Sequence, residues 1–478
     1  MTVRLRGVFG AVWPGLAFFA VLLLISLPEG LNTITSVAHV PLLTGASAFE
    51  RAAGDTDAGS LMSAALSYSQ TGKLLGGYFW VLNLWPPGMV GVDVLIIAAQ
   101  NATGIPAVLL MVLLNCLVWA ASLGFYFVVI RARRGLLTAG IFAVAALLYS
   151  GTSVWGMRNG LFYSDSFGAL AFCTALVLLF LCAEAVGRRR IALAVVAGGF
   201  LGVAAYFRAT FELINNVLFV GGIVLVVVLL LLRRMRRSPA WTGAALATAV
   251  PIAVAGAVYM LVTLPWRAYA GLRIRPGDFR WSTVADIISG QRWIPSSQLD
   301  GVASFLDEGH INWACRLDAA VCQRIADAEL GSLEPYTGRG HFTNAQFDQY
   351  TTEAALGHPL QFLQERFGML TLGFTSETGS AIGVLAVAES LLLAIALVLL
   401  VVAFVRGAGY RNPGFVVFAI ATAGQFATLL LFHQESRYFL AIELSIILVA
   451  ALVLRPGTRP SDEPRRYADT ASESSAAP

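Results

Sequence analysis

The stretch GIPAVLLMVLLNCLVWAASLGFYFVVIRARR, residues 104–134, decides the class of this chain. Residues 104–130 carry no charged side chain, and as a helix they exceed the roughly 20 residues needed to cross the hydrocarbon core of a bilayer. The rest of the chain is similar, since 57% of its 478 residues are hydrophobic, 13% are charged and the mean hydropathy is +0.73. This composition predicts an all-α polytopic membrane protein and excludes a soluble globular one.

Ten stretches have the length and apolar composition of membrane-spanning helices. They are residues 8–28, 104–130, 136–155, 164–186, 191–209, 212–232, 240–265, 382–405, 414–432 and 437–454. If the spans alternate in direction, the arginine clusters beside them all fall on one side of the membrane. These clusters are RLR at 4–6, RARR at 131–134, GRRR at 187–190, RRMRR at 233–237, RGAGYR at 406–411 and RPGTRP at 455–460. The positive-inside rule makes that side the cytoplasm, so both termini are predicted to be cytoplasmic.

The spans divide the chain into regions of different polarity. Residues 1–265 are predicted to form an N-terminal membrane core whose first outer loop covers 29–103. Residues 266–381 are predicted to form a small extracytoplasmic domain before the eighth span. Residues 382–456 hold the C-terminal transmembrane helices, and the Pro-, Ser- and Ala-rich residues 457–478 are typical of a disordered cytoplasmic tail.

Two segments of the first outer loop are predicted to be interfacial helices. SLMSAALSYSQTGKLL, residues 60–75, has apolar side chains at roughly helical spacing. GMVGVDVLIIAAQ, residues 88–100, is apolar but too short and too interrupted to span a bilayer. Both segments are therefore expected to lie at the outer membrane surface.

Charge and cysteine content restrict the partners of the protein. The formal net charge is only +4 and the arginines lie beside apolar runs, so the lipid bilayer is the predicted partner and nucleic acid is excluded. Lys73 is the one lysine among 32 basic residues, which indicates a GC-rich genome of the actinobacterial type. The predicted location is the cytoplasmic membrane of a bacterium. Cys315 and Cys322 lie in the outer region, and the sequence leaves open whether they form a disulfide.

Acidic side chains of the outer loops are candidate catalytic groups. Asp55 and Asp57 precede the predicted helix at 60–75, where a carboxylate could act as general base on an acceptor hydroxyl. Asp165 lies at the outer end of the span 164–186. Asp57 and Asp165 are also explained as helix caps, so the residues alone leave both roles open.

Arginines at the outer ends of spans are candidate phosphate ligands. Arg208 in AYFRAT and Arg437 in HQESRYF both lie at the predicted outer surface, and a planar guanidinium suits two phosphate oxygens at once. The alternative for each is an interfacial arginine that reaches lipid headgroups. Glu184, by contrast, is predicted to pair with the adjacent GRRR cluster at the cytoplasmic end.

Several of these motifs together resemble GT-C glycosyltransferases of the group related to protein O-mannosyltransferases and aminoarabinose transferases. The first outer loop has, in the family's order, Asp57, Leu61, Ala65, Gly72 and the run Pro86, Pro87, Gly88. The later motifs that are similar, again in order, are YSD at 163–165, AYFRAT at 205–210, PWRAYAG at 265–271, and His433, Arg437 and Tyr438. The resemblance covers most of the membrane core but does not extend to residues 272–381.

The resemblance implies transfer of a sugar from a polyprenyl-phosphate donor to an extracytoplasmic glycan, lipid or protein. It implies Asp57 as the catalytic base or an acceptor-binding carboxylate, and Asp165 as a second site carboxylate. It implies a donor-phosphate site in which Arg208 and Arg437 bind the phosphate and Tyr438 and His433 line the pocket. Where the family usually has Asp-Glu or Asp-Ser, this chain has Asp57 followed by Ala58, and a further acid, Asp55, lies two residues earlier. Either aspartate could therefore be the base. No cofactor is predicted; Asp and His side chains could bind a divalent metal, but no spacing such as H-E-x-x-H supports a metal site.

Three other classes of membrane protein compete with this hypothesis. A transporter or flippase of lipid-linked sugars would need polar groups near the bilayer midplane and often has broken helices in repeated halves. An O-antigen-type polymerase or ligase would lack the early aspartate and the Pro-Pro-Gly run. A scaffold protein would have no reason to collect acids and histidines on one face.

Overall fold

The computed structural model describes an all-helical chain, and no strand occurs in the part that it describes. The described residues are 2–36, 39–53, 57–73, 86–150, 164–208, 240–273, 356–364, 420–426 and 440–453, with short pieces between 211 and 231 and single residues at 318, 320, 353, 398 and 418. Two of the predicted spans, 382–405 and 414–432, lie largely outside these residues. The predicted tail 457–478 lies wholly outside them.

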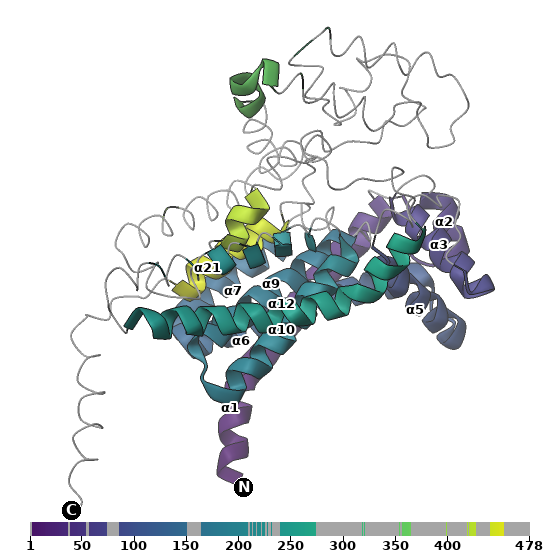
Figure 1. Cartoon of the computed structure of the whole chain (residues 1–478). Coiled ribbons are helices and arrows are strands. Elements are labelled where there is room, and N and C mark those ends of the chain that lie inside the picture. Colours follow the sequence, from purple (N-terminus) through teal and green to yellow (C-terminus); the bar gives the residue numbers. More distant parts are fainter. Residues whose placement is uncertain are drawn as a thin grey trace, which may run out of the picture.

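The helices of the described residues form a bundle with a smaller group packed at one end. The bundle helices are α1 (Thr2–Ser36), α6 (Ala107–Arg134), α7 (Leu136–Ser150), α9 (Ser164–Glu184), α10 (Gly187–Phe207), α12 (Ala240–Arg273) and α21 (Leu440–Val453). The smaller group is α2 (Ala46–Ala53), α3 (Asp57–Thr71) and α5 (Gly88–Thr103) (Figure 1). Helices thus form at both segments predicted for the first outer loop, whereas α2 was not predicted.

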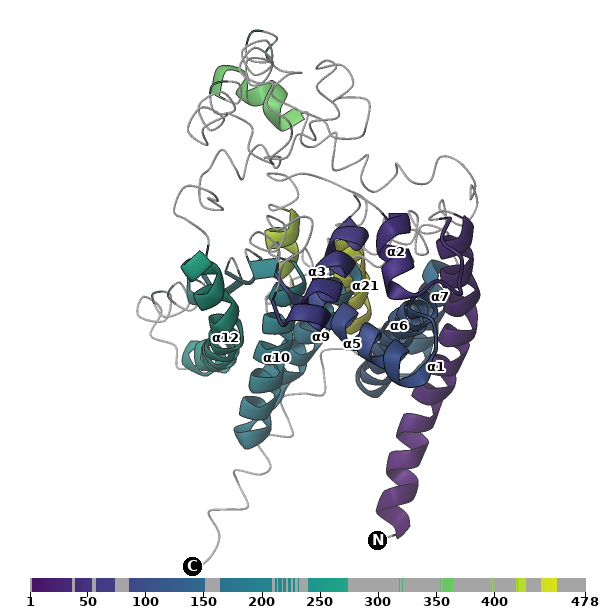
Figure 2. The same cartoon turned by 90° about the vertical axis from the view of Figure 1, so that its right-hand side faces the viewer.

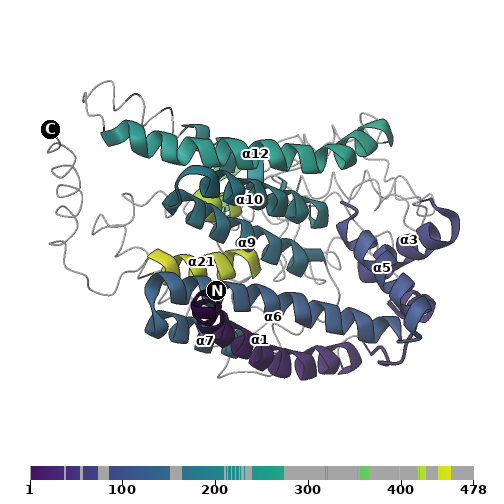
Figure 3. The ribbon, with the colours of Figure 1, turned by 90° about the horizontal axis from the view of Figure 1, so that it is seen from below.

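The order of the helices in space differs from their order in the chain. Figures 2 and 3 show α12, α10 and α9 following one another on one side, and α6, α7 and α1 on the other. Helix α21, near the end of the chain, lies between these two halves and contacts both α9 and α6. The first residue of α21, Leu440, is therefore placed inside the bundle.

Five helices of the described residues are long and apolar enough to cross a membrane. They cover Trp13–Ser36, Ala107–Arg134, Ser164–Glu184, Gly187–Phe207 and Pro251–Ala268. The predicted spans 136–155 and 437–454 correspond to the shorter apolar helices α7 and α21. Multiple membrane spans are therefore supported, while the number ten stays a prediction.

Two helices continue past the ends that were predicted for them. Helix α1 runs to Ser36 instead of ending at residue 28, and α12 runs to Arg273 instead of 265. The sequence is misleading here because Pro28 and Pro265 look like helix ends, yet both lie inside their helices. In membrane helices a proline is tolerated because neighbouring groups and local adjustments satisfy the backbone carbonyl that it leaves unbonded.

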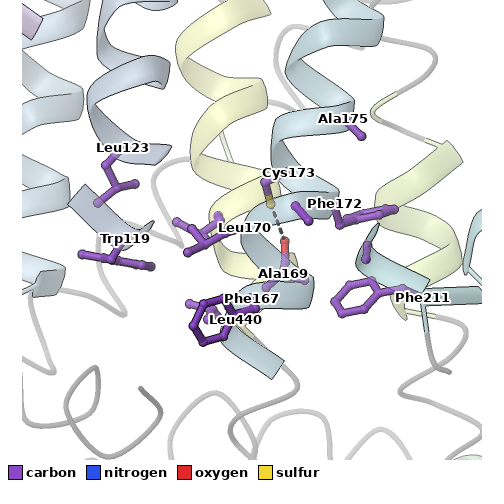
Figure 4. Close-up of a cluster of buried hydrophobic side chains, with 14 of the residues drawn as sticks. Trp119, Leu123, Phe167, Ala169, Leu170, Phe172, Cys173, Ala175, Phe211 and Leu440 are labelled. Atoms are coloured by element: carbon purple, nitrogen blue, oxygen red, sulfur yellow. Dashed lines mark hydrogen bonds between the residues drawn. The ribbon is translucent and has the colours of Figure 1, made fainter. Parts of the chain in front are cut away.

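Helix α9 is the centre of the bundle, and every residue from Ser164 to Phe180 is buried. Its neighbours include Trp119 and Leu123 of α6, Phe211, and Leu440 of α21, all members of one buried cluster (Figure 4). A helix that is hydrophobic on all sides is expected in such a position because it has no solvent-facing stripe. Its N-terminal residues are thereby held firmly in place.

Glycines allow α10 and α12 to lie close together. A Cβ atom added to Gly198 would lie 2.4 Å from the carbonyl oxygen of Ala255, and one added to Gly202 would lie 2.4 Å from Cγ1 of Val262. Small residues are typical of helix interfaces in membranes, where close backbone approach supplies the van der Waals contact that drives association.

The arginine clusters at 131–134 and 187–190 lie at the same end of the bundle. Arg133 pairs with Glu184 at 3.1 Å, and Arg134 Nε donates to the carbonyl oxygen of Leu452. The predicted pairing of Glu184 with the neighbouring GRRR cluster is therefore wrong. The C-terminal ends of α6 and α9 lie side by side, which brings Arg133 to Glu184, and Arg190 instead donates to the carbonyl oxygen of Ala185 at 2.7 Å.

A single glutamine ties the smaller group of helices to the bundle. The side-chain oxygen of Gln100 on α5 accepts hydrogen bonds from the backbone N–H groups of Ala46 at 3.1 Å and Ala107 at 3.0 Å. These N–H groups lie at the starts of α2 and α6, where a helix has no backbone acceptor for them. Gln100 thus fixes three helices relative to one another.

Candidate functional site

A buried ion pair lies at the end of the bundle opposite to the arginine clusters. Arg208 Nε lies 3.0 Å from Asp165 Oδ1, and the two side chains are only 14% and 6% exposed. Both residues were predicted as site residues, and the structure brings them together from different helices. An acid paired this closely with arginine is better suited to orient the guanidinium than to accept a proton from an acceptor.

The local sequence explains why the pair forms there. Asp165 lies in the first turn of α9, and Arg208 directly follows α10 with an extended backbone at φ −147° and ψ 130°. Phe167 stacks on Phe207 with ring centroids 5.2 Å apart, which holds the start of α9 against the end of α10. Aromatic packing therefore fixes the backbone on both sides of the ion pair.

The Pro-Pro-Gly run of the first outer loop packs on the same chain segment. A Cβ atom added to Gly88 would lie 2.5 Å from the carbonyl oxygen of Tyr206 and 3.1 Å from the backbone nitrogen of Phe207. Only glycine permits this approach, and Pro86 is buried beside it. Segments 86–88, 163–165 and 205–210 are distant in the sequence, yet their described residues meet at one end of the bundle.

This contact leads to a test with a matched control. Gly88→Ala is expected to destabilise the protein by about 1–3 kcal/mol and to displace the end of α10, since the new methyl group meets backbone atoms. Gly91→Ala is expected to be neutral or stabilising by up to about 1 kcal/mol, because a Cβ added at Gly91 has nothing within 4 Å. Thermal unfolding in detergent checks both, and equal effects would contradict the close packing.

A second ion pair lies beside the turn that begins at Arg208, after the end of α10. Arg267 Nη2 of α12 lies 2.7 Å from Glu212 Oε1 and donates to Tyr259 Oη at 2.9 Å. Phe211 N donates to the carbonyl oxygen of Arg208 at 3.0 Å, so the turn from Arg208 to Glu212 is held at both ends. Arg208 connects it to α9 and Glu212 connects it to α12.

Asp93 is an acid that the sequence analysis did not single out. It lies on α5 on the same face as Met89, Val90 and Ile97, and is 1% exposed. Its Oδ1 has no hydrogen-bond partner among the described residues. Burial raises the pKa of Asp93 well above its ordinary value, because the apolar surroundings disfavour the charged carboxylate.

The raised pKa of Asp93 predicts that stability falls as pH rises. Above about pH 4 the unfolded chain releases this proton while the folded chain retains it, so the free energy of unfolding decreases with pH until the folded pKa is passed. Asp93→Asn is expected to remove this part of the pH dependence, and Asp93→Leu to stabilise the protein by about 1–3 kcal/mol at neutral pH. Thermal unfolding from pH 5 to 8 checks it; identical pH profiles of the wild type and Asp93→Asn would contradict it.

A carboxylate also lies deep inside the bundle. Glu443 of α21 is 1% exposed, and its Oε2 accepts a hydrogen bond from Tyr149 Oη of α7 at 2.5 Å. Leu452 of α21 contacts Arg134 at the arginine end of the bundle, and Glu443 lies about 14 Å before Leu452 along the helix. The whole distance between the two ends, from Asp165 to Glu184 along α9, is about 28 Å. Glu443 is therefore about halfway between the two ends of the bundle.

The other predicted site residues are described only in part. Asp57 is the first residue of α3, and its side chain lies outside the described part of the structure. Asp55, His433, Arg437 and Tyr438 lie outside it altogether, as do Cys315 and Cys322. Among the described residues, no three His, Cys, Asp or Glu side chains are grouped so that they could hold a metal ion.

The sequence held one indication that Asp93 and Glu443 are unusual, since each is a lone acid in an otherwise apolar segment.

Comparisons with models of protein families, with curated proteins and with solved structures find no match to this chain.

Proposed function

We propose that this protein is an integral membrane glycosyltransferase that moves a sugar from a polyprenyl-phosphate donor to an acceptor outside the cytoplasmic membrane. The observation that carries the proposal is the meeting of three separated motifs at one end of the bundle. Gly88 packs on the backbone of Tyr206, and two residues later Arg208 pairs with Asp165. The arginine clusters lie at the opposite end, which by the positive-inside rule faces the cytoplasm.

The chemistry of such a transfer fits this end of the bundle. When the sugar leaves, negative charge develops on the polyprenyl phosphate, and fixed cations stabilise that charge. Arg208 is held by Asp165 through its Nε, so the guanidinium keeps one orientation. An arginine fixed in this way loses little conformational entropy when it binds phosphate oxygens.

The acceptor side of the reaction is assigned to the start of α3. Asp57, or Asp55 two residues before it, would take the proton from the acceptor hydroxyl. Helix α3 packs on α5, whose first residue Gly88 contacts the end of α10, so α3 and Arg208 belong to one packed unit. His433, Arg437 and Tyr438 would complete the donor-phosphate site from the segment before α21.

A transfer assay tests the proposal. Purified protein in lipid is incubated with a panel of polyprenyl-phosphate sugars labelled in the sugar, and with a membrane extract as acceptor. Label is expected to reach the acceptor from one donor of the panel and from no nucleotide sugar. Transfer from none of the lipid donors would count against the proposal.

A second candidate, a transporter of lipid-linked sugars, is favoured by Glu443. An acid near the middle of the membrane is typical of coupled transport, where it binds a proton or ion. This candidate predicts movement of the intact lipid across sealed vesicles without any acceptor, and Glu443→Gln would stop that movement. A vesicle assay that detects no movement would exclude it.

A further inference from the structure

We infer that Glu443 and Tyr149 are positioning residues that fix the rotation and depth of α21, and thereby the donor-phosphate site. The inference rests on the proposed transfer reaction, and it adds two residues to which the resemblance implies no role. Both lie within the bundle, away from the ion pair of Arg208 and Asp165.

The contact between α7 and α21 is rigid on the α7 side. Tyr149 is 4% exposed, and its ring stacks on Trp119 of α6 with centroids 5.8 Å apart. Trp119 Nε1 donates to Ser150 Oγ at 2.8 Å, and Ser150 Oγ donates to the carbonyl oxygen of Ala146 at 2.6 Å. The phenol that reaches Glu443 is therefore held by α6 as well as by its own helix.

Polar contacts hold α21 on a second face and at its far end. Ser445 Oγ lies 3.7 Å from Cys173 Sγ of α9 and accepts a hydrogen bond from Gln425 Nε2 at 3.1 Å. At the far end the carbonyl oxygen of Leu452 accepts a hydrogen bond from Arg134.

Directional contacts matter for α21 because apolar packing specifies rotation weakly inside a membrane. Helix α21 is enclosed by α9, α6 and α7, and most of its side chains are apolar, so burial of apolar surface alone does not distinguish one rotation from another; van der Waals fit and hydrogen bonds do. A buried carboxyl group costs more than a leucine in this place. Its retention is explained if the hydrogen bond to Tyr149 selects one register of the helix.

The register of α21 matters because the predicted site residues directly precede it. His433, Arg437 and Tyr438 come before Leu440, the first residue of α21. A slip of one residue rotates a helix by about 100° and shifts it by about 1.5 Å. A misplacement of about 1 Å can cost about 10²-fold in rate, so loss of register is expected to weaken donor use.

The test compares two buried tyrosines whose hydroxyl groups bond to different helices, Tyr149 to α21 and Tyr126 to α9. Tyr149→Phe removes the hydrogen bond to Glu443, whereas Tyr126→Phe removes equally buried hydrogen bonds, to the carbonyl oxygen of Leu170 and to Thr174 Oγ1, both on α9. Glu443→Leu removes the acceptor, and Glu443→Gln keeps an oxygen that can accept from Tyr149. All four variants are assayed for transfer at varied donor concentration and for thermal unfolding.

Tyr149→Phe and Glu443→Leu are expected to raise the KM for the donor about tenfold or more per folded protein. Tyr126→Phe and Glu443→Gln are expected to stay within about threefold of the wild type, although Tyr126→Phe lowers thermal stability as much as Tyr149→Phe. A merely structural contact would affect both tyrosine variants alike. Unchanged donor KM in Tyr149→Phe and Glu443→Leu, or equal changes in the two tyrosine variants, would overturn the inference.

A second readout does not depend on transfer. Ser445→Cys places a thiol beside Cys173, and the rate of disulfide formation under an added oxidant reports the register of α21. Adding Tyr149→Phe is expected to slow this cross-link at least threefold, while adding Tyr126→Phe leaves it unchanged. An unaltered cross-linking rate would overturn the inference, whereas a wild type without transfer activity and with the expected cross-linking would overturn only the proposed function.

Discussion

Arg208→Ala is expected to lower the rate of sugar transfer by about 10²–10³-fold, the usual effect of removing one group that stabilises a developing anion. The reason is that Arg208 lies at the C-terminal end of α10, is only 14% exposed and is oriented by Asp165 at 3.0 Å, so neither lipid nor solvent offers an equivalent cation. Arg208→Lys keeps the charge but not the planar fork, and is expected to recover only part of the rate. Single-turnover transfer at saturating donor measures both effects.

The stability of Arg208→Ala needs a separate control. Removing one partner of a buried ion pair costs about 3–5 kcal/mol, because the carboxylate of Asp165 stays buried without the charge of Arg208. The double variant Arg208→Ala/Asp165→Asn removes that charge and is expected to regain folding without regaining transfer. Arg267→Ala, which breaks the more exposed pair with Glu212, is expected to change transfer less than tenfold. An Arg208→Ala protein that keeps a tenth or more of wild-type turnover would refute the assignment.

Asp57→Ala is expected to lower transfer by about 10²–10⁴-fold, which is the contribution of a general base. Folding is expected to change little, since Asp57 is the first residue of α3 and an acid in a first helical turn contributes at most about 1 kcal/mol. Transfer rate at saturating donor and acceptor measures the first effect, and thermal unfolding the second.

Asp55→Ala is the matched comparison for Asp57→Ala. If Asp57 is the base, Asp55→Ala is expected to keep transfer within about tenfold of the wild type, and the reverse pattern would name Asp55 instead. Near-normal turnover in both variants would remove the base from the start of α3.

The composition and periodicity of the sequence predicted the membrane class and most helices of the described residues. Apolar runs of sufficient length mark α6, α9 and α10 with errors of a few residues, because a bilayer requires such runs. The prolines at 28 and 265 produced the larger errors, since their effect on a helix depends on neighbours that the sequence does not specify. The register of α21 has no local signal at all.

The candidate site was predicted as separate residues, not as contacts. Asp165 and Arg208 were each singled out, yet their pairing depends on the packing of α9 against α10, which no local pattern encodes. The same limit explains the error at Glu184, where sequence proximity favoured the GRRR cluster but tertiary packing brings Arg133 closer. Asp93 was overlooked because one acid in an interfacial helix is ordinarily solvated, whereas α5 packs against α3, α6 and α10 and Asp93 is buried.

The central claim, sugar transfer from a polyprenyl phosphate at the end of the bundle that carries Arg208, is tested most directly with a doubly labelled donor. Wild-type protein in sealed vesicles receives a polyprenyl-phosphate sugar that carries one label in the sugar and another in the lipid, together with an external acceptor. Transfer predicts that the sugar label moves to the acceptor while the lipid label stays in the vesicle as free polyprenyl phosphate. Both labels crossing the membrane together, without separation, would contradict the claim.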